Sequence, residues 1–173
     1  MTQSSLVQRL VLGLSLAFVA SPAAVAAADG TVHAAPAAKP APKNQATCRV
    51  MSILAKKEGD GSVPKNLAAL EAQLRSDQFA AFKSFRLIEE KAMRVNDAAD
   101  TSLAMKMGYE VRLRLLAAPA RRLKLHLGLT SKGAAKPLLD ADYSVAEGGV
   151  LLVVAGQRDG GRALFAFQCR RAD

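Results

Sequence analysis

The chain contains few of the side chains that perform catalysis or bind metals. Its 173 residues include no tryptophan, two histidines and two cysteines. A nucleophile usually needs a neighbouring base, yet His126 is the one histidine in the part of the chain that we expect to fold. Asp140 and Asp142 alternate on one strand and could share a cation, but a solvated strand face explains that spacing better. The sequence also lacks glycine-rich phosphate loops and the serine elbow of hydrolases. The sequence therefore disfavours an enzyme and indicates no metal and no cofactor.

Residues 1–28 have the pattern of a secretory signal peptide. Arg9 supplies a positive charge ahead of a short apolar run, and small residues with Ala-x-Ala spacing end at Ala26 and Ala28. An uncleaved membrane anchor is the alternative, because the apolar run can be extended to Ala28. A Ser-Pro pair interrupts the run, which favours cleavage. Cleavage would leave no transmembrane segment and predicts a periplasmic or secreted protein.

Acidic residues are scarce as well. There are 15 of them against 24 lysines and arginines, and the formal net charge is +9. Such a charge attracts anionic partners over long range. In an exported protein we expect an anionic component of the cell envelope or an acidic protein. Nucleic acid is disfavoured, because the chain carries an export signal and lacks aromatic side chains on which bases stack.

The two cysteines lie near the two ends of the expected domain. Residues 29–46 are rich in alanine and proline and predict a disordered linker, which leaves residues 47–171 as a single β-rich domain. In an exported protein, Cys48 and Cys169 predict a disulfide. Because its geometry requires Cα atoms within about 7 Å, the first and last strands should be neighbours. A redox-active pair is disfavoured, because catalytic cysteines usually sit two residues apart at a helix N-terminus.

Alternation of apolar and polar residues dominates this domain and predicts half-buried strands. One helix is expected from Pro64 to a point between Leu74 and Phe79, with leucines at helical spacing. The apolar run at 150–155 predicts a central strand covered on both faces. The other expected strands are 47–55, 84–95, a long strand at 103–115 that bends or bulges at Gly108, 123–129, 139–145 and 163–170. The predicted class is α+β, mostly β: an antiparallel sheet or a two-sheet sandwich of about seven strands with one helix.

Cations gather on the polar side of two successive strands. Arg112 and Arg114 alternate with buried residues on the first strand, and Arg122 and Lys124 do so on the second. In one register of the two strands Arg114 is opposite Lys124, and after a slip of two residues it is opposite Arg122. Because the buried residues fix which side each cation faces, both registers place all four cations on the same side of the sheet. We predict that these four side chains form an anion-binding face. The alternative is a solvated basic face that deters aggregation of the sheet.

The runs VMSILA, VPKNLAALEAQL and FAAFKSFRLIEE, with leucine-rich strands after them, resemble a group of small exported bacterial proteins that has no assigned activity. The resemblance covers residues 50 to 170 and implies export and a compact β-rich fold. It carries no site residue. The expected function is a non-catalytic accessory or binding module of the cell envelope that recognises an anionic ligand or surface. The alternative is a secreted enzyme inhibitor, or an enzyme whose site the sequence does not reveal.

Overall fold

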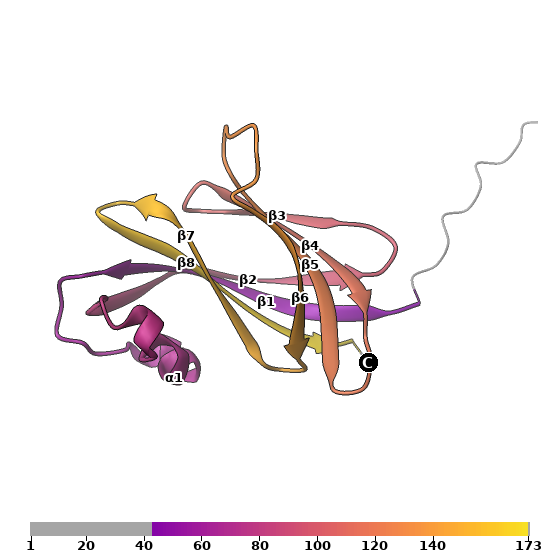
Figure 1. Cartoon of the computed structure of the whole chain (residues 1–173), viewed down its shortest axis with the longest axis horizontal. Helices are drawn as coiled ribbons and strands as arrows, with labels where there is room; N and C mark the ends of the chain where they lie inside the picture. The colour runs from indigo at the N-terminus through magenta and orange to yellow at the C-terminus, as the bar shows by residue number, and fades with distance from the viewer. Residues whose placement is uncertain (1–42, 173) are drawn as a thin grey trace, which may run out of the picture. The chain divides into compact units, whose positions relative to one another are not determined.

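The computed structural model describes residues 43–172, which form eight strands in two antiparallel sheets (Figure 1). Sheet A has the order β2 (Ser84–Asn96), β1 (Gln45–Lys56), β8 (Gly161–Arg171) and β7 (Val150–Arg158). Sheet B has the order β3 (Thr101–Met105), β4 (Tyr109–Ala117), β5 (Arg122–Ser131) and β6 (Leu139–Ala146). The predicted fold class is confirmed. The predicted signal peptide lies outside the described residues, and the last two residues assigned to the linker, Gln45 and Ala46, begin β1.

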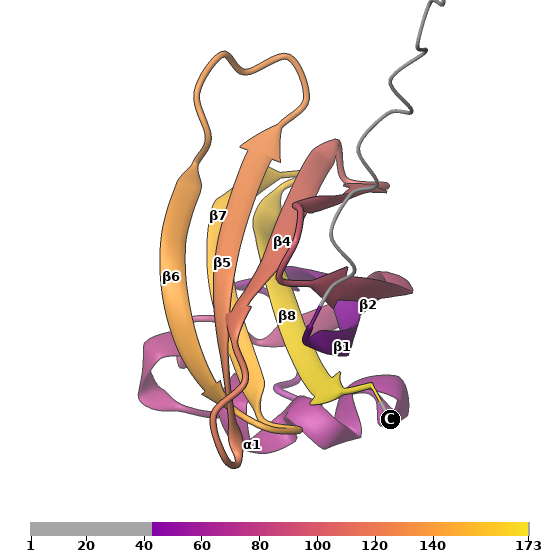
Figure 2. The same cartoon turned by 90° about the vertical axis from the view of Figure 1, so that its right-hand side faces the viewer.

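The chain winds through the two sheets as a meander. Within each sheet all neighbouring strands run antiparallel, and β8 returns to pair with β1, where the meander began. Figure 2 shows the two sheets facing each other, with β4, β5 and β6 in front of β7 and β8. Among residues 43–172 there is no helix long and apolar enough to span a bilayer.

The core between the sheets follows from the period of two. Alternate residues of β4 and β5 point inward, so that Val111, Leu113, Leu125 and Leu127 are buried. From sheet A the inward residues include Phe165, whose ring meets that of Tyr109 edge to face at a centroid distance of 5.2 Å.

The predicted disulfide is present and lies in this core. Cys48 and Cys169 are directly opposed on β1 and β8, with their Cα atoms 4.1 Å apart. Both cysteines are buried. The prediction that the first and last strands are neighbours is therefore confirmed.

Two strand predictions are corrected. The long strand expected at 103–115 is two strands, because Gly108 adopts a φ of 73° and its amide closes a turn onto the Met105 carbonyl at 3.1 Å. The run at 150–155 is part of β7, which is an edge strand and not a central one. Its two-sided apolar pattern has another cause: Leu151 packs against the core between the sheets, whereas Leu152 packs against a second core on the outer face of sheet A.

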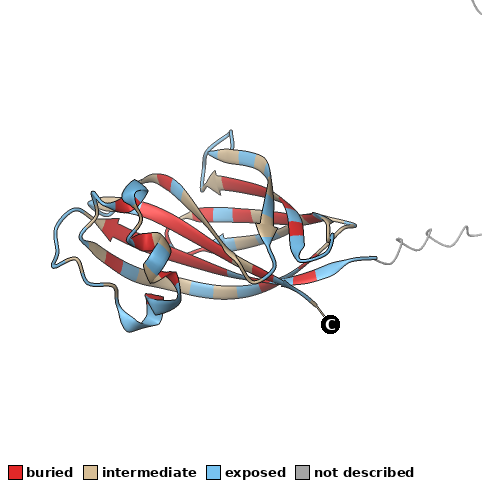
Figure 3. Cartoon of the chain, turned by 60° about the horizontal axis from the view of Figure 1, so that its bottom comes forward, coloured by how far each residue is buried: buried red, intermediate tan, exposed pale blue. Residues whose placement is uncertain are grey.

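That second core is made by three short helical turns between β1 and β2, here called the helical segment: η1 (Lys65–Leu70), α1 (Glu71–Leu74) and η2 (Asp77–Phe79). Most of it is 3-10 helix, so the single helix predicted from spacing is broken into turns. The expected apolar positions are nevertheless the buried ones: Leu67, Leu70, Leu74 and Phe79. They pack on the outer face of sheet A. Figure 3 shows the segment lying across one part of that face and leaving the rest uncovered.

Side chains join the two sheets where β2 passes β3. The Glu89 carboxylate accepts a hydrogen bond from the backbone amide of Lys106 at 2.8 Å, and Lys91 donates one to the Ala104 carbonyl at 2.7 Å. Lys91 and Glu89 also form an ion pair at 3.2 Å. The Glu89 side chain is only 8% exposed, so this carboxylate is nearly enclosed at the junction.

Candidate functional site

The four cations predicted to bind an anion all lie on the outward side of sheet B, but in neither register considered from the sequence. Arg114 is opposite His126, and Arg112 is opposite Gly128. Lys124 is opposite Ala117 on β4 and opposite Ser144 on β6. The parity argument therefore holds, whereas the direct pairing of cation with cation does not occur.

Protein groups already satisfy much of this stripe. Arg114 forms an ion pair with Asp100 at 3.4 Å, and Arg122 donates to the hydroxyl and carbonyl oxygens of Ser144 at 2.9 and 2.8 Å. His126 lies between two carboxylates, with Nε2 2.8 Å from Asp140 and Nδ1 2.7 Å from Asp142. The two aspartates that suggested a shared cation thus both contact an imidazole. We call this outward side, with its cations and carboxylates, the sheet B face.

The outer face of sheet A is different, because the helical segment divides it into two polar ends. One end carries Thr47, Arg49, Arg94, Gln168 and Arg170, which we call the arginine face. The other end lies at the tip of the β7–β8 hairpin. Between them the face is apolar and covered by the helical segment.

The arginine face is fixed by the ladders of three strands. Thr47 pairs with Arg94 on β2 and with Arg170 on β8, so the two arginines are two strands apart, or about 10 Å. Both are exposed, and within residues 43–172 neither forms an ion pair. This face contains a groove of about 280 Å³, which is lined by Thr47, Arg49, Gln168 and Arg170.

Among residues 43–172, Arg49 is the one cation of this face that forms an ion pair with a carboxylate. Its Nε and Nη2 atoms donate to the two oxygens of Glu90 at 2.5 and 2.8 Å. The hydrogen bond to Glu90 raises the pKa of Arg49 above its ordinary value. This fork fixes the Arg49 side chain and leaves the positive charge of Arg94 and Arg170 uncompensated at the same end of the sheet.

Sequence reasoning missed the arginine face, although a signal for it was present. The predicted disulfide opposes Cys48 and Cys169, and antiparallel pairing then places Thr47 opposite Arg170. Arg170 could therefore have been assigned to the outward side beside β1. The position of Arg94 could not, because it depends on β2 pairing with the other edge of β1.

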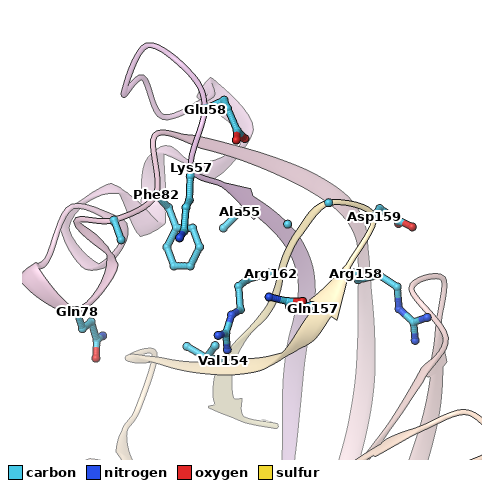
Figure 4. Close-up of a pocket in the computed structure, with 13 residues that line it drawn as sticks. Ala55, Lys57, Glu58, Gln78, Phe82, Val154, Gln157, Arg158, Asp159 and Arg162 are labelled. Carbon is cyan, nitrogen blue, oxygen red and sulfur yellow. The ribbon is translucent and has the colours of Figure 1, made fainter.

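The second polar end contains a pocket of about 690 Å³, which we call the hairpin pocket (Figure 4). Its walls come from the end of β1, the residues after η2 and the β7–β8 turn. Its lining includes Ala55, Lys57, Phe82, Val154 and Arg162. Comparison of the chain with protein-family models, curated proteins and solved structures gives no significant match. The two-sheet sandwich and its surfaces are therefore the basis for assigning a function.

Proposed function

We propose that this protein is a non-catalytic binding module of the cell envelope, periplasmic or secreted, whose arginine face docks on the phosphate groups of anionic lipids. The observation that carries the proposal is the pair of exposed arginines, Arg94 and Arg170, held on either side of Thr47 without a carboxylate partner in residues 43–172. The buried disulfide supports an oxidising compartment, as does the signal-like pattern of residues 1–28.

The chemistry of the face suits phosphates presented by a surface. A guanidinium group offers two parallel donors that match phosphate oxygens. The Thr47 hydroxyl lies between the two arginines and can add a neutral donor. The Gln168 amide, beside Arg49 on the next strand, already donates to the Gly148 carbonyl at 2.9 Å. Because the groups stand on paired strands, their spacing is set before binding. The chain that precedes the domain also joins it at this end, because β1 begins at Gln45.

The test compares two double variants of equal net charge. Arg94→Gln/Arg170→Gln removes two cations from the arginine face, and Arg112→Gln/Lys124→Gln removes two from the sheet B face. Binding to phosphatidylglycerol vesicles is measured by co-sedimentation, with phosphatidylcholine vesicles as the uncharged reference. A cation close to an anionic membrane contributes about 1 kcal/mol, so the first variant should bind about 30-fold more weakly. The control should change little, because the packed sheets are about 10 Å apart and the Debye length is about 8 Å.

Equal weakening by the two variants would contradict the proposal, because it would show that net charge alone drives binding. Undiminished binding of Arg94→Gln/Arg170→Gln would contradict it as well. All four substituted side chains point outward from their sheets, so both variants should unfold at the temperature of the wild type, and calorimetry checks this. Binding that weakens with added salt in the wild type is also expected.

A further inference from the structure

The hairpin pocket combines free positive charge with exposed apolar surface. Its floor is the outer side of sheet A beyond the helical segment, where Ala55 on β1 is paired with Arg162 on β8. Lys57 follows the end of β1. In Figure 4 the side chains of Lys57 and Arg162 lie over this floor from two sides. Within residues 43–172 neither of them forms an ion pair.

The other charged groups of the pocket are directed elsewhere. Arg158 lies over the ring of Tyr109, with its guanidinium carbon 5.3 Å from the ring centroid. Figure 4 shows the Arg158 side chain leaving the pocket, and it shows the carboxylates of Glu58 and Asp159 at the rim. The centre of the pocket therefore has the charge of two cations, and its rim discourages a large polyanion.

Apolar groups complete the lining. Phe82 and Ala55 are beside the two cations, and Val154 is 47% exposed although it belongs to a strand. The turn approaches β1 closely: a side chain at Gly161 would come within 2.5 Å of the Ala55 carbonyl oxygen, so this position carries none. Exposed apolar side chains next to unpaired cations are complementary to a ligand that has both characters.

We propose that the hairpin pocket binds a molecule with a single anionic headgroup on a short apolar chain. Lys57 and Arg162 hold the carboxylate or phosphate, while Phe82 and Val154 contact the chain. The volume of about 690 Å³ lies in the range of small-molecule sites. Two sources share this chemistry, namely a free amphiphilic carboxylic acid and the phosphate of a lipid. The pocket is separate from the arginine face, because the helical segment lies between them.

The experiment follows the backbone amides of Gly160 and Gly161 by ¹H–¹⁵N NMR, because both line the pocket. Octanoate and octyl phosphate are the probes for the two sources. Acetate lacks the chain and octanol lacks the charge. We expect saturable shifts with octanoate, octyl phosphate or both, and affinities at least tenfold lower for acetate and octanol. From hexanoate to octanoate the affinity should rise about fourfold per methylene. The tighter of the two eight-carbon probes identifies the source.

Three variants localise the binding. Lys57→Gln/Arg162→Gln should weaken octanoate binding about tenfold or more, because two charge-assisted hydrogen bonds are lost. Val154→Ser should weaken it several-fold while the fold is kept, because this side chain is exposed. Arg94→Gln/Arg170→Gln, with the same charge as the first variant, should bind octanoate like the wild type.

Equal binding of octanoate and acetate would overturn the inference. So would octanoate affinity that is unchanged in Lys57→Gln/Arg162→Gln, or the absence of any shift at Gly160 and Gly161. Because vesicle docking depends on Arg94 and Arg170, failure of the pocket would leave the proposed function untouched. Failure of vesicle docking would likewise leave the pocket untouched.

Discussion

The two outward faces of the sandwich use their charged residues in opposite ways. On the sheet B face the polar side chains are interleaved with carboxylates: Arg114 forms an ion pair with Asp100, and the His126 imidazole contacts Asp140 and Asp142. On sheet A, within the described part of the chain, most cations at both ends lack a carboxylate partner, and Arg49 alone has one at the arginine face.

This difference shows that a stripe of cations in a sequence does not define an anion site. Like charges on neighbouring strands disfavour pairing, and sheet B avoids that cost by bringing acidic residues of β6 next to β5. Fewer acidic residues lie beside the arginines of sheet A. Arg94 and Arg170, which form no ion pair within residues 43–172, are therefore available to solvent or to a ligand. Both proposals therefore fall on sheet A.

Loss of the disulfide is expected to have the largest effect and to fall on sheet A. The bridge joins residues 121 positions apart, and removing a loop constraint of this length costs about 4–5 kcal/mol in the chain-entropy description. Cys48→Ala/Cys169→Ala should lower the free energy of unfolding by that amount in urea titrations. Amide exchange should accelerate more at Thr47 and Arg170 than at Arg112, because the arginine face depends on the β1–β8 ladder.

Equal acceleration of amide exchange on the two sheets would contradict the expected difference between them, because it would mean that the sandwich opens only as a whole. Wild-type protein under reducing conditions is the matched control and should behave like the variant. A loss of stability below about 1 kcal/mol would contradict the entropic argument for so long a loop.

Much of the fold could be predicted because buried residues repeat every second position. The parity of β4 and β5 placed four cations on one side correctly, and the cysteine pair made β1 and β8 neighbours. The register of β4 against β5 could not be predicted. Arg114 is opposite His126, and the ladder has an irregularity between Leu115 and Ala117 that alternation does not reveal. The charge balance across β5 and β6 was missed because alternation does not show which residues of these two strands are paired.

Two further limits are physical. Alternation continues through the turn at Gly108, because Met107 is buried like a strand residue, so the pattern could not separate β3 from β4. The apolar run of β7 indicated cover on two faces, but a helical segment can supply that cover as well as a neighbouring sheet can. The hairpin pocket depends on how the residues after η2 meet the β7–β8 turn, and no local pattern encodes that meeting.

Acidification is expected to have the next largest effect, through a carboxylate of sheet A that serves the fold. Burial opposes ionisation of Glu89, but the Lys106 amide and the Lys91 ammonium outweigh this and hold the pKa of Glu89 below its ordinary value of 4.5. A lowered pKa stabilises the fold above the ordinary value, and this contribution is lost as the pH falls through the pKa of the folded state. A hydrogen bond to a charged group contributes about 1.5–3 kcal/mol to the free energy of unfolding, so the loss should be of this order.

The measurement is the free energy of unfolding of wild type and Glu89→Gln at pH ~7 and pH ~3. The variant should be less stable at neutral pH, and the difference should shrink in acid, as the pH falls below the ordinary pKa toward the lowered pKa of the folded state. Asp142→Asn is the control, because its carboxylate is exposed on the sheet B face. A constant difference between wild type and Glu89→Gln across this range would refute the role of the ionised carboxylate.

The smallest effect on stability is expected from removing carboxylates of the sheet B face, a change that should make this face resemble sheet A. Asp140→Asn/Asp142→Asn removes two carboxylates from the sheet B face and leaves Arg112, Arg114, Arg122 and Lys124 in place. Exposed ion pairs contribute about 0–1 kcal/mol each, so the free energy of unfolding should change little. Binding to phosphatidylglycerol vesicles should nevertheless rise several-fold, because the face would then carry an excess of positive charge.

If Arg112→Gln/Lys124→Gln in this background returns binding to the wild-type level, the carboxylates of the sheet B face are what prevent it from binding anionic vesicles. If binding does not rise at all, charge balance is not the difference between the two faces, and the fixed spacing of Arg94 and Arg170 is.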